Sequence, residues 1–491
     1  MPALVTRSGT LSYNMLNHRV GLFAQWLLDQ NLVTGDRAAT WLPKNELACL
    51  MPLAAARAGL VHVPINPLLK PAQVEHIISD SGAKLLIANA ARIKSLMEGL
   101  EDRSHNLYVD SDVTQAIDNI DKSLTPSDKD IDTDTLAAIL YTSGSTGKPK
   151  GVMLSHANLS LGAISVATYL KLGRDERTLC VLPLSFDYGQ NQLFSTWYAG
   201  GCCYPLDYLT PRDVIKACAN NQITTLAAVP PLWVQLVEQD WSGEATSTMR
   251  RLTNSGGALT PALVKQLRMI FGSKTDIYAM YGLTEAFRST YLDPHLIDKN
   301  PTSMGKAIPF AEIMVVKPDG SLSASGEDGE LVHAGPLVAQ GYWQDAARTA
   351  QRYKSAPADS VYGGIAVWSG DTVRRDDDGL LYFVGRDDAM IKSSGNRISP
   401  AEIEDAALAS SMAAEALAVG VADERLGQAI RLFIRPKTSE IGTDVIEKLG
   451  NYLKTNLPNF MHPREIIVLD NFPKNPNGKI DRNALMQIEV I

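Results

Sequence analysis

A loop rich in glycine and hydroxyl side chains carries the clearest chemical signal in the sequence. It reads Tyr141-Thr-Ser-Gly-Ser-Thr-Gly-Lys-Pro-Lys-Gly151 and directly follows Ala137–Leu140, an apolar stretch that predicts a strand. Glycines let backbone amides face a polyphosphate, hydroxyl groups add donors, and the lysines add positive charge. Only two residues separate Gly144 from Gly147, which is not the spacing of a P-loop NTPase. The sequence therefore predicts a polyphosphate-binding loop of another kind.

Five further motifs follow this loop along the chain. They are Tyr281-Gly-Leu-Thr-Glu285, Trp368-Ser-Gly-Asp371, Gly385-Arg-Asp-Asp388, Lys392-Ser-Ser-Gly-Asn-Arg-Ile398 and Pro473-Lys-Asn-Pro-Asn-Gly-Lys479. Together with the loop they resemble the adenylate-forming superfamily of acyl-CoA synthetases, luciferases and adenylation domains of nonribosomal peptide synthetases. The resemblance covers almost the whole chain and is strongest to stand-alone AMP-forming acyl-CoA ligases of the exosortase-associated type.

This resemblance implies a ligase reaction in two steps. A carboxylate attacks the α-phosphate of ATP to give acyl-AMP and pyrophosphate, and a thiol of CoA or of a carrier-protein phosphopantetheine then displaces AMP. Thr284 would contact the α-phosphate, and Glu285 would ligate Mg²⁺, a hard cation that prefers oxygen ligands. The implied phosphate-binding residues are Thr142, Ser143, Gly144, Ser145, Thr146, Gly147 and Lys150.

The resemblance also assigns residues to the nucleoside part of ATP. Tyr281 would stack on the adenine, and Asp371 and Arg386 would hold the ribose hydroxyls. Ala279 stands where many relatives have a polar amide that reads the adenine amino group, so base recognition would rest on backbone groups. The backbone positions implied beside the base are Gly256, Gly257, Ala258 and Gly282.

The last part of the chain would have both a catalytic and a mobile role. Lys479, in a turn with Gly478, would neutralise charge across the carboxylate and the α-phosphate during adenylation. The terminal domain would then rotate about Asp388 and bring Gly395 to the site, where the missing side chain leaves room for a pantetheine arm. Sequence alone does not separate a hinge at Asp388 from an ordinary turn residue.

Three segments are expected to line the carboxylate pocket: residues 182–190, 227–233 and 286–289. The residues they contribute are Phe186, Asp187, Trp233 and Arg288. Phe186-Asp187 resembles the pair of amino-acid-adenylating enzymes whose Asp binds the substrate α-ammonium, whereas a shift of one residue would place Asp187 at an aliphatic position of acyl-CoA synthetases. A buried charge without a partner is costly, so Asp187 and Arg288 either pair with each other or meet opposite charge on the substrate. In the second case the substrate is polar or zwitterionic.

The composition is that of a globular enzyme. The 491 residues carry a formal net charge of −8, with 45% hydrophobic and 20% charged residues, which excludes a disordered chain and disfavours a general nucleic-acid binder. The five cysteines include no CxxC spacing, which indicates a reducing compartment and no structural zinc. No apolar run is long enough for a membrane span and the N-terminus lacks the pattern of a signal peptide, so we expect a cytoplasmic protein.

Apolar stretches and helical segments alternate along most of the chain, which predicts parallel sheets covered by helices. Examples are strands at Arg37–Trp41, Leu85–Ala88 and Asp276–Ala279 and a helix at Pro71–Ser81. From about Glu312 short strand-like stretches separated by turn residues predict a small antiparallel unit. We expect an α/β fold with a large N-terminal ATP- and acyl-binding domain (1–387) of packed α/β subdomains plus this β unit, and a smaller, mobile α+β C-terminal domain (388–491).

Three functions are compatible with these residues. The first is a ligase that forms a CoA thioester of a small or medium carboxylic acid, with or without an amino group. The second is a ligase that loads an amino acid or another acid onto a carrier protein, which Asp187 and the stand-alone length favour. The third is a catalytically silent nucleotide-binding regulator. The presence of Lys479, Glu285, Asp371 and Lys150 argues against this third function.

Overall fold

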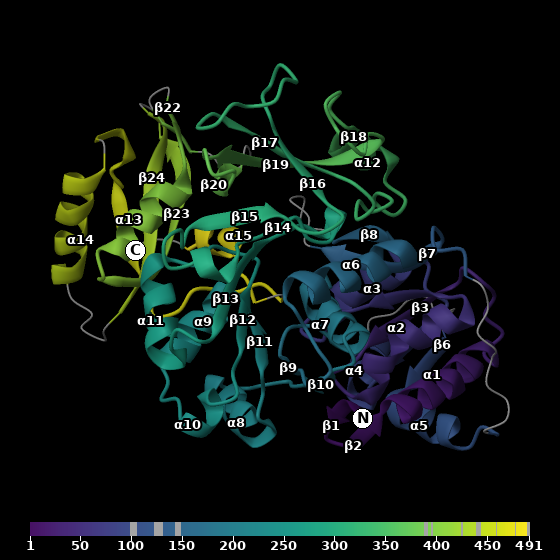
Figure 1. Cartoon of the computed structure of the whole chain (residues 1–491). Coiled ribbons are helices and arrows are strands. Elements are labelled where there is room, and N and C mark those ends of the chain that lie inside the picture. The colour runs from purple at the N-terminus through teal and green to yellow at the C-terminus, as the bar shows by residue number, and fades with distance from the viewer. Residues whose placement is uncertain are drawn as a thin grey trace.

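The structure is a computed structural model of the chain. It describes residues 1–98, 106–121, 131–142, 149–386, 391–393, 396–423, 426–437, 443–457, 459–476 and 478–488. Within these ranges helices and strands alternate from the N-terminus, purple in Figure 1, to the C-terminal part, in yellow. The predicted α/β class is confirmed.

A six-stranded sheet in the order β6-β5-β3-β4-β7-β8 forms the core of the N-terminal part of the described chain. Its strands are β3 (Arg37–Trp41), β4 (Val61–Pro64), β5 (Leu85–Ala88), β6 (Asn106–Val109), β7 (Leu136–Thr142) and β8 (Lys150–Ser155). All pairs are parallel except the β7–β8 hairpin. Strand β5 is buried at every position because its alternate residues face two cores: Leu85 and Ile87 join one cluster, and Leu86 and Ala88 join another.

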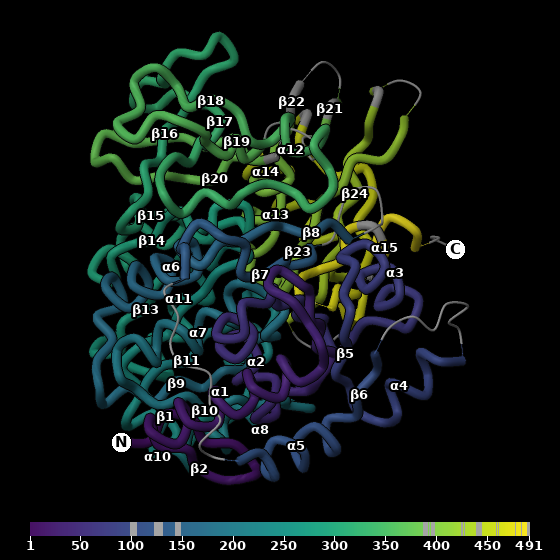
Figure 2. The backbone as a smooth tube through the Cα atoms, turned by 90° about the vertical axis from the view of Figure 1, so that its right-hand side faces the viewer, coloured from purple at the N-terminus to yellow at the C-terminus, as the bar shows by residue number. Residues whose placement is uncertain are grey.

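Helices cover both faces of the sheets in this part of the molecule. They are α1 (Tyr13–Leu28), α2 (Glu46–Ala58), α3 (Pro71–Ser81), α4 (Ala90–Met97), α5 (Asp110–Asp118), α6 (His156–Tyr169), α7 (Asp187–Tyr198), α8 (Pro211–Asn221), α9 (Pro230–Val237), α10 (Gly243–Thr246), α11 (Pro261–Phe271) and α12 (Ala346–Arg352). Helix α3 has the predicted bounds because proline suits its first position, while Gly82, with a φ of +61°, ends it in a left-handed conformation. In Figure 2, α1 and α2 face the viewer.

A 14-stranded sheet of the described residues runs in the order β16-β17-β19-β20-β15-β14-β13-β12-β11-β9-β10-β1-β2, with β18 paired to β19. Its strands are β1 (Pro2–Thr6), β2 (Gly9–Ser12), β9 (Arg177–Cys180), β10 (Cys202–Pro205), β11 (Thr225–Ala228), β12 (Arg251–Asn254), β13 (Asp276–Tyr281), β14 (Thr290–Tyr291), β15 (Ser303–Ala307), β16 (Glu312–Val316), β17 (Asp328–Ala334), β18 (Tyr353–Ser355), β19 (Ile365–Arg375) and β20 (Leu381–Arg386). The predicted antiparallel unit is present, but β14 and β15 connect it by hydrogen bonds to the parallel strands β9–β13.

The C-terminal part has its own sheet, in the order β22-β21-β24-β23 with β25 beside β24. Its elements are β21 (Ile391–Ser393), β22 (Asn396–Ile398), α13 (Pro400–Ala409), β23 (Ala413–Asp423), β24 (Gly427–Pro436), α14 (Thr443–Asn456), β25 (Glu465–Val468) and α15 (Arg482–Met486). Figure 1 shows it at the left, where α13 contacts α11. An ion pair between Arg435 and Glu238, 2.9 Å long, joins it to the end of α9. The proposed boundary at residues 387 and 388 lies outside the described residues and stays a prediction.

No helix in the described part of the chain combines the length and the apolar composition that a membrane span requires.

Candidate active site

The predicted polyphosphate loop connects the two strands of the β7–β8 hairpin. Thr142, at the end of β7, pairs with Lys150, at the start of β8, so these two residues form the base of the loop. The Oγ1 atom of Thr142 is buried and has no hydrogen-bond partner among the described residues. Strand β8, which stands between the loop and helix α6, was not predicted from the sequence. The predicted residues between these strands, Ser143, Gly144, Ser145, Thr146 and Gly147, lie outside the described residues.

Lys150, Glu285 and Tyr342 form a closed triangle of hydrogen bonds beside this hairpin. Lys150 Nζ donates to Glu285 Oε1 at 2.9 Å and to Tyr342 Oη at 2.8 Å. Tyr342 Oη donates in turn to the same Glu285 Oε1 at 2.6 Å. The ammonium also lies 4.2 Å from the centre of the Tyr342 ring, a distance at which a cation is attracted to an aromatic face.

The triangle keeps its carboxylate ionised. Burial raises the pKa of Glu285, but the positive charge of Lys150 and the hydrogen bonds from Tyr342 and Lys150 outweigh burial and leave the pKa below its ordinary value. Burial lowers the pKa of Lys150, and the nearby carboxylate of Glu285 opposes that shift. Both side-chain contacts of Glu285 fall on Oε1, which leaves Oε2 for a cation.

Tyr342 reaches the triangle through backbone pairing that the sequence did not reveal. Met153 N donates to Gly341 O at 2.9 Å, and Trp343 N donates to Gly151 O at 2.8 Å. Residues 341–343 thus run antiparallel beside β8 and place the Tyr342 side chain next to Lys150. The sequence analysis missed Tyr342 because its stretch, Gly341-Tyr-Trp343, has no charged neighbour and no catalytic spacing.

Thr284 and Asp187, two predicted site residues, lie next to each other. Thr284 begins a 3₁₀ turn (Thr284–Ala286) after β13, and Asp187 is the first residue of α7. Thr284 Oγ1 donates to Asp187 Oδ1 at 3.3 Å. Asp187 is buried, and this burial raises the pKa of its carboxyl despite the opposing charges of Arg288 and Lys479.

Lys479 lies near Phe186 and Asp187, although it belongs to the C-terminal part of the chain. Its Nζ atom is 5.4 Å from the centre of the Phe186 ring. Gly256 makes room for it, because a Cβ atom at that position would lie 2.8 Å from Lys479 Cε. Gly256 also has a φ of +81°, a conformation that glycine adopts without strain. The structure therefore brings together Lys479, Phe186, Gly256 and Asp187.

The residues predicted to bind the nucleoside form a second group, with Tyr281 at the end of β13 and Asp371 within β19. Tyr281 Oη donates a hydrogen bond to Asp371 Oδ2. The backbone of Arg386 in β20 pairs opposite Asp371, whereas the Arg386 side chain lies outside the described residues. Gly282 packs tightly, since an added Cβ would come within 2.8 Å of Arg288 Cα.

Of the remaining predicted positions, the structure describes some and leaves others out. Gly257 and Ala258 are exposed in the loop after β12, and Asn254 Nδ2 fixes this loop by donating to Gly257 O at 2.8 Å. Asp388 and Gly395 lie outside the described residues, so their predicted roles as hinge and pantetheine contact stay predictions.

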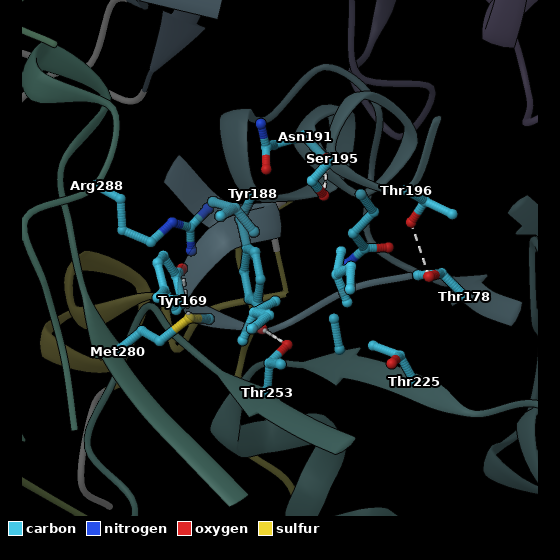
Figure 3. A pocket seen from close by; sticks show the side chains of 15 residues that line it. Tyr169, Thr178, Tyr188, Asn191, Ser195, Thr196, Thr225, Thr253, Met280 and Arg288 are labelled. Atoms are coloured by element: carbon cyan, nitrogen blue, oxygen red, sulfur yellow. Dashed lines mark hydrogen bonds between the residues drawn. The ribbon is translucent and has the colours of Figure 1, made fainter. Parts of the chain in front are cut away.

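A narrow cavity lies between α6, α7 and the strands β9, β11 and β12, and Arg288 is part of its wall (Figure 3). Polar side chains of α7, Asn191 and Gln192, also line it. Of the four predicted pocket residues, Arg288 belongs to this wall, whereas Trp233 is buried in the hydrophobic core and Phe186 and Asp187 lie outside the wall. The sequence analysis missed Asn191 and Gln192, although a run of amides (Gln190-Asn-Gln192) in an apolar segment was a usable signal.

Comparison with protein-family models shows the family to which the chain belongs. The model of the AMP-binding enzyme family matches residues 1–343, and that of the AMP-binding enzyme C-terminal domain matches residues 402–479. The chain therefore belongs to the AMP-binding enzyme family and is an AMP-forming ligase. Use of ATP, and of CoA or a carrier protein, is consistent with this family. The exosortase-associated type stays a prediction.

Two of the relatives are named for different acceptors of the acyl group, a carrier protein in one and CoA in the other. An L-proline–[L-prolyl-carrier protein] ligase of Pseudomonas fluorescens is 31% identical over 98% of this chain and 95% of its own. A feruloyl-CoA synthase of Amycolatopsis is 30% identical over 97% and 94%. The solved structure of ATP-bound MatB from Rhodopseudomonas palustris has a TM-score of 0.88 at 26% identity, covering 99% of this chain and 95% of that one. The chain also spans 6% to 19% of the length of longer synthases and synthetases.

Proposed function

We propose that this ligase activates a small carboxylic acid with ATP and transfers the acyl group to the thiol of CoA. The supporting observation is the position of Lys479, which lies beside Phe186 and Gly256 and close enough to Asp187 to act on its pKa. An ammonium at this place can stabilise negative charge that develops between a carboxylate and an α-phosphate.

In the first step a carboxylate oxygen of the substrate attacks the α-phosphorus, and pyrophosphate leaves with the electrons of the broken P–O bond. Lys479 would neutralise charge on the attacking and α-phosphate oxygens, while the Thr284 hydroxyl would orient the same phosphate. The hairpin loop above Thr142 and Lys150 would hold the β- and γ-phosphates.

Glu285 is the residue that would hold Mg²⁺, which when bound neutralises charge on the phosphates. Its carboxylate is ionised and has one oxygen without a side-chain contact, which fits a hard cation. Among the described residues no group of three or more acidic, histidine or cysteine side chains could hold a metal, so phosphate and water oxygens would supply the remaining ligands.

In the second step the thiol sulfur attacks the acyl carbonyl carbon, and AMP leaves. For this step the C-terminal domain (388–491) would rotate about Asp388, withdraw Lys479 and present Gly395 to the pantetheine arm. Two contacts that such a rotation would break are the Arg435–Glu238 ion pair and the hydrogen bond from Asn66 Nδ2 to Pro476 O, 2.9 Å long. The ion pair is partly exposed, so it adds little to the cost of rotation.

A second candidate is a ligase that loads an amino acid onto the phosphopantetheine of a carrier protein. The observation in its favour is Asp187, a buried carboxylate that accepts a hydrogen bond from Thr284. Such a carboxylate would bind the α-ammonium of an amino acid. The relative named as an L-proline–carrier-protein ligase supports this candidate.

Carboxylate-dependent exchange of labelled pyrophosphate into ATP tests the first step for both candidates. A panel of small acids and amino acids should contain at least one that drives exchange, and thioester formation is then compared with CoA and with a phosphopantetheinylated carrier protein. If no acid drives exchange although the protein binds ATP, the chain is the silent regulator and the proposed function is wrong.

A further inference from the structure

Arg288 is a buried cation without an anionic partner in the described structure. It is 2% exposed, and its guanidinium carbon lies 4.5 Å from the centre of the Tyr188 ring. No Asp or Glu side chain of the described residues lies within 4.0 Å of its nitrogens, and its Nε has no acceptor there. A buried charge that is not paired costs a protein several kcal/mol, so a ligand of opposite charge is the expected partner.

Asp187 does not fill this role. It is near enough for the two charges to interact, yet no ion pair within 4.0 Å joins it to Arg288, and its Oδ1 accepts a hydrogen bond from Thr284 instead. The pairing of these two residues, which the sequence left open, is thus not seen among the described contacts. Each charge is left to meet a group of the substrate.

The amides beside Arg288 also lack partners. Asn191 is 2% exposed and Gln192 is 6% exposed. The Nδ2 atom of Asn191 and both polar atoms of the Gln192 side chain are buried without a hydrogen bond in the described part of the chain. Buried polar atoms in proteins are almost always satisfied, so several unsatisfied atoms in one wall fit a site that receives a polar group.

These three side chains line the same cavity. Figure 3 shows Arg288 extending toward Tyr188, with Asn191 on the neighbouring helix α7. The cavity is small: the space open to the centres of water molecules is about 20 Å³, room for at least one water. A compact group with several acceptor oxygens matches its donors better than an alkyl chain does.

We propose that the substrate carries a second acidic group at the end away from its reacting carboxylate, and that Arg288 binds this group with help from the amides of Asn191 and Gln192. The proposal rests on the proposed function, because Lys479 and Thr284 fix the end where the reacting carboxylate must lie. The substrate is then a small dicarboxylic acid. If Asp187 binds an α-ammonium, it is an acidic amino acid.

The spacing of Asp187 and Asn191 along helix α7 suggests the length of this substrate. Asn191 lies one turn after Asp187 on the same face of α7, which at 1.5 Å per residue is roughly 6 Å along the axis. A chain of roughly two to four carbon atoms spans that distance between the two acidic ends. We therefore expect long-chain acids to be poor substrates.

Pyrophosphate exchange with matched pairs of acids tests the proposal. The pairs are succinate and butyrate, glutarate and valerate, aspartate and asparagine, and glutamate and glutamine. In the wild type the kcat/KM of the best diacid should exceed that of its neutral partner by about tenfold or more, since a site built for a charged group rejects analogues that lack it. Arg288→Gln should lower this ratio about tenfold, and Arg288→Glu should reverse the preference toward acids with a distal ammonium, such as ornithine.

Arg374→Gln is the matched control, because Arg374 is an exposed arginine of β19 that pairs with Asp328 away from the cavity. It should keep the wild-type ratio. Exchange with neutral acids that equals or exceeds exchange with diacids in the wild type would overturn the proposal and leave the proposed function intact. Absence of exchange with every acid would instead remove the proposed function. If the Arg288 variants do not fold, as judged by ATP binding, the wild-type ratios alone decide.

Discussion

Lys479 Nζ lies 5.4 Å from the centre of the Phe186 ring, so a lysine near the C-terminus is in place at a pocket built by the N-terminal part of the chain. The turn that presents it depends on Gly478, whose φ is +78°, and on a hydrogen bond of 2.7 Å from Asn475 N to Lys479 O. Across the gap, Gly256 offers no side chain that would block the ammonium. The described arrangement is therefore compatible with the role in adenylation that we propose for Lys479.

Lys479→Ala should abolish adenylation but spare the second step. Loss of one preorganised electrostatic group lowers kcat by about 10²–10³-fold, so pyrophosphate exchange should fall by at least that factor. Thioester formation from supplied acyl-AMP should stay within a few fold of wild type, because the proposed rotation would withdraw Lys479 before this step. Lys448→Ala, an exposed lysine of α14, is the control and should change neither step. Equal losses in both steps would contradict the division of labour.

Tyr342→Phe should weaken the use of MgATP by about 1 kcal/mol, or roughly fivefold in kcat/KM, the typical net worth of a hydrogen bond. The hydroxyl helps to hold the pKa of Glu285 low, so its removal raises that pKa and should move the acidic limb of the pH profile to higher pH. The measurement is kcat/KM for ATP as a function of pH at saturating magnesium.

Tyr353→Phe is a close control for this prediction. Tyr353 packs edge-on against Tyr342, with ring centres 5.6 Å apart, and its buried hydroxyl has no hydrogen-bond partner among the described residues. Its loss should leave the pH profile unchanged. A shift of the same size in both variants would mean that ring packing, and not the hydrogen bond to Glu285, sets the profile.

Local signals were enough to predict several elements from the sequence. The bounds of α3 and β5 agree with the prediction because Pro71 and Gly82 mark the helix ends and Leu85–Ala88 is uniformly apolar. Strand β8 was missed, since Lys150–Ser155 begins in a polar loop and is a strand only through pairing with β7. The same reason hid Tyr342, which gains its contacts from a bridge to β8.

The motifs in the sequence identified the individual site residues. They did not show which of these residues contact one another. Whether Asp187 pairs with Arg288 depends on how the start of α7 approaches the turn after β13, and the residues lie far apart along the chain. No local pattern encodes that approach. The absence of an ion pair between them among the described contacts, on which the substrate proposal rests, could come only from three-dimensional structure.

Asp187→Asn should stabilise the protein at neutral pH while impairing amino-acid substrates. Burial raises the pKa of Asp187 above its value in the unfolded chain, so its stabilising contribution is present below the unfolded pKa and is lost as pH rises through the folded one. The thermal midpoint of the variant should thus exceed that of wild type at pH 7.5, with a smaller gap near pH 4. Activity with acids that carry an α-ammonium should fall about tenfold or more.

Asp213→Asn is a control for which we expect the opposite change in the thermal midpoint. Backbone hydrogen bonds from Thr210 and Leu209 at the start of α8 hold the pKa of Asp213 below its ordinary value. That carboxylate stabilises the fold above its unfolded pKa, so the variant should melt lower than wild type at pH 7.5. A lower midpoint for Asp187→Asn as well would show that the Asp187 carboxylate is satisfied in the free enzyme.

Two buried histidines should make the fold sensitive to acid. Burial lowers the pKa of His62 and of His333 to about 3. Each ring shares one hydrogen bond of 2.9 Å with a hydroxyl group, that of Thr40 for His62 and that of Ser289 for His333. Because the unfolded chain binds a proton near pH 6.5 and the folded chain does not, stability is complete above that pH and falls as pH drops toward 3. At pH 5 each histidine should cost about 2 kcal/mol of the free energy of unfolding, from 1.36 kcal/mol per pH unit.

His62→Gln and His333→Gln remove this proton uptake one site at a time. Each should reduce the loss of unfolding free energy between pH 7.5 and pH 5, measured by urea denaturation, by about 2 kcal/mol, even if its stability at pH 7.5 is lower than that of wild type. His295→Gln, at an exposed position, serves as the substitution control. Since only a buried neutral imidazole links unfolding to proton uptake in this way, an equal reduction in all three variants would locate the acid sensitivity elsewhere.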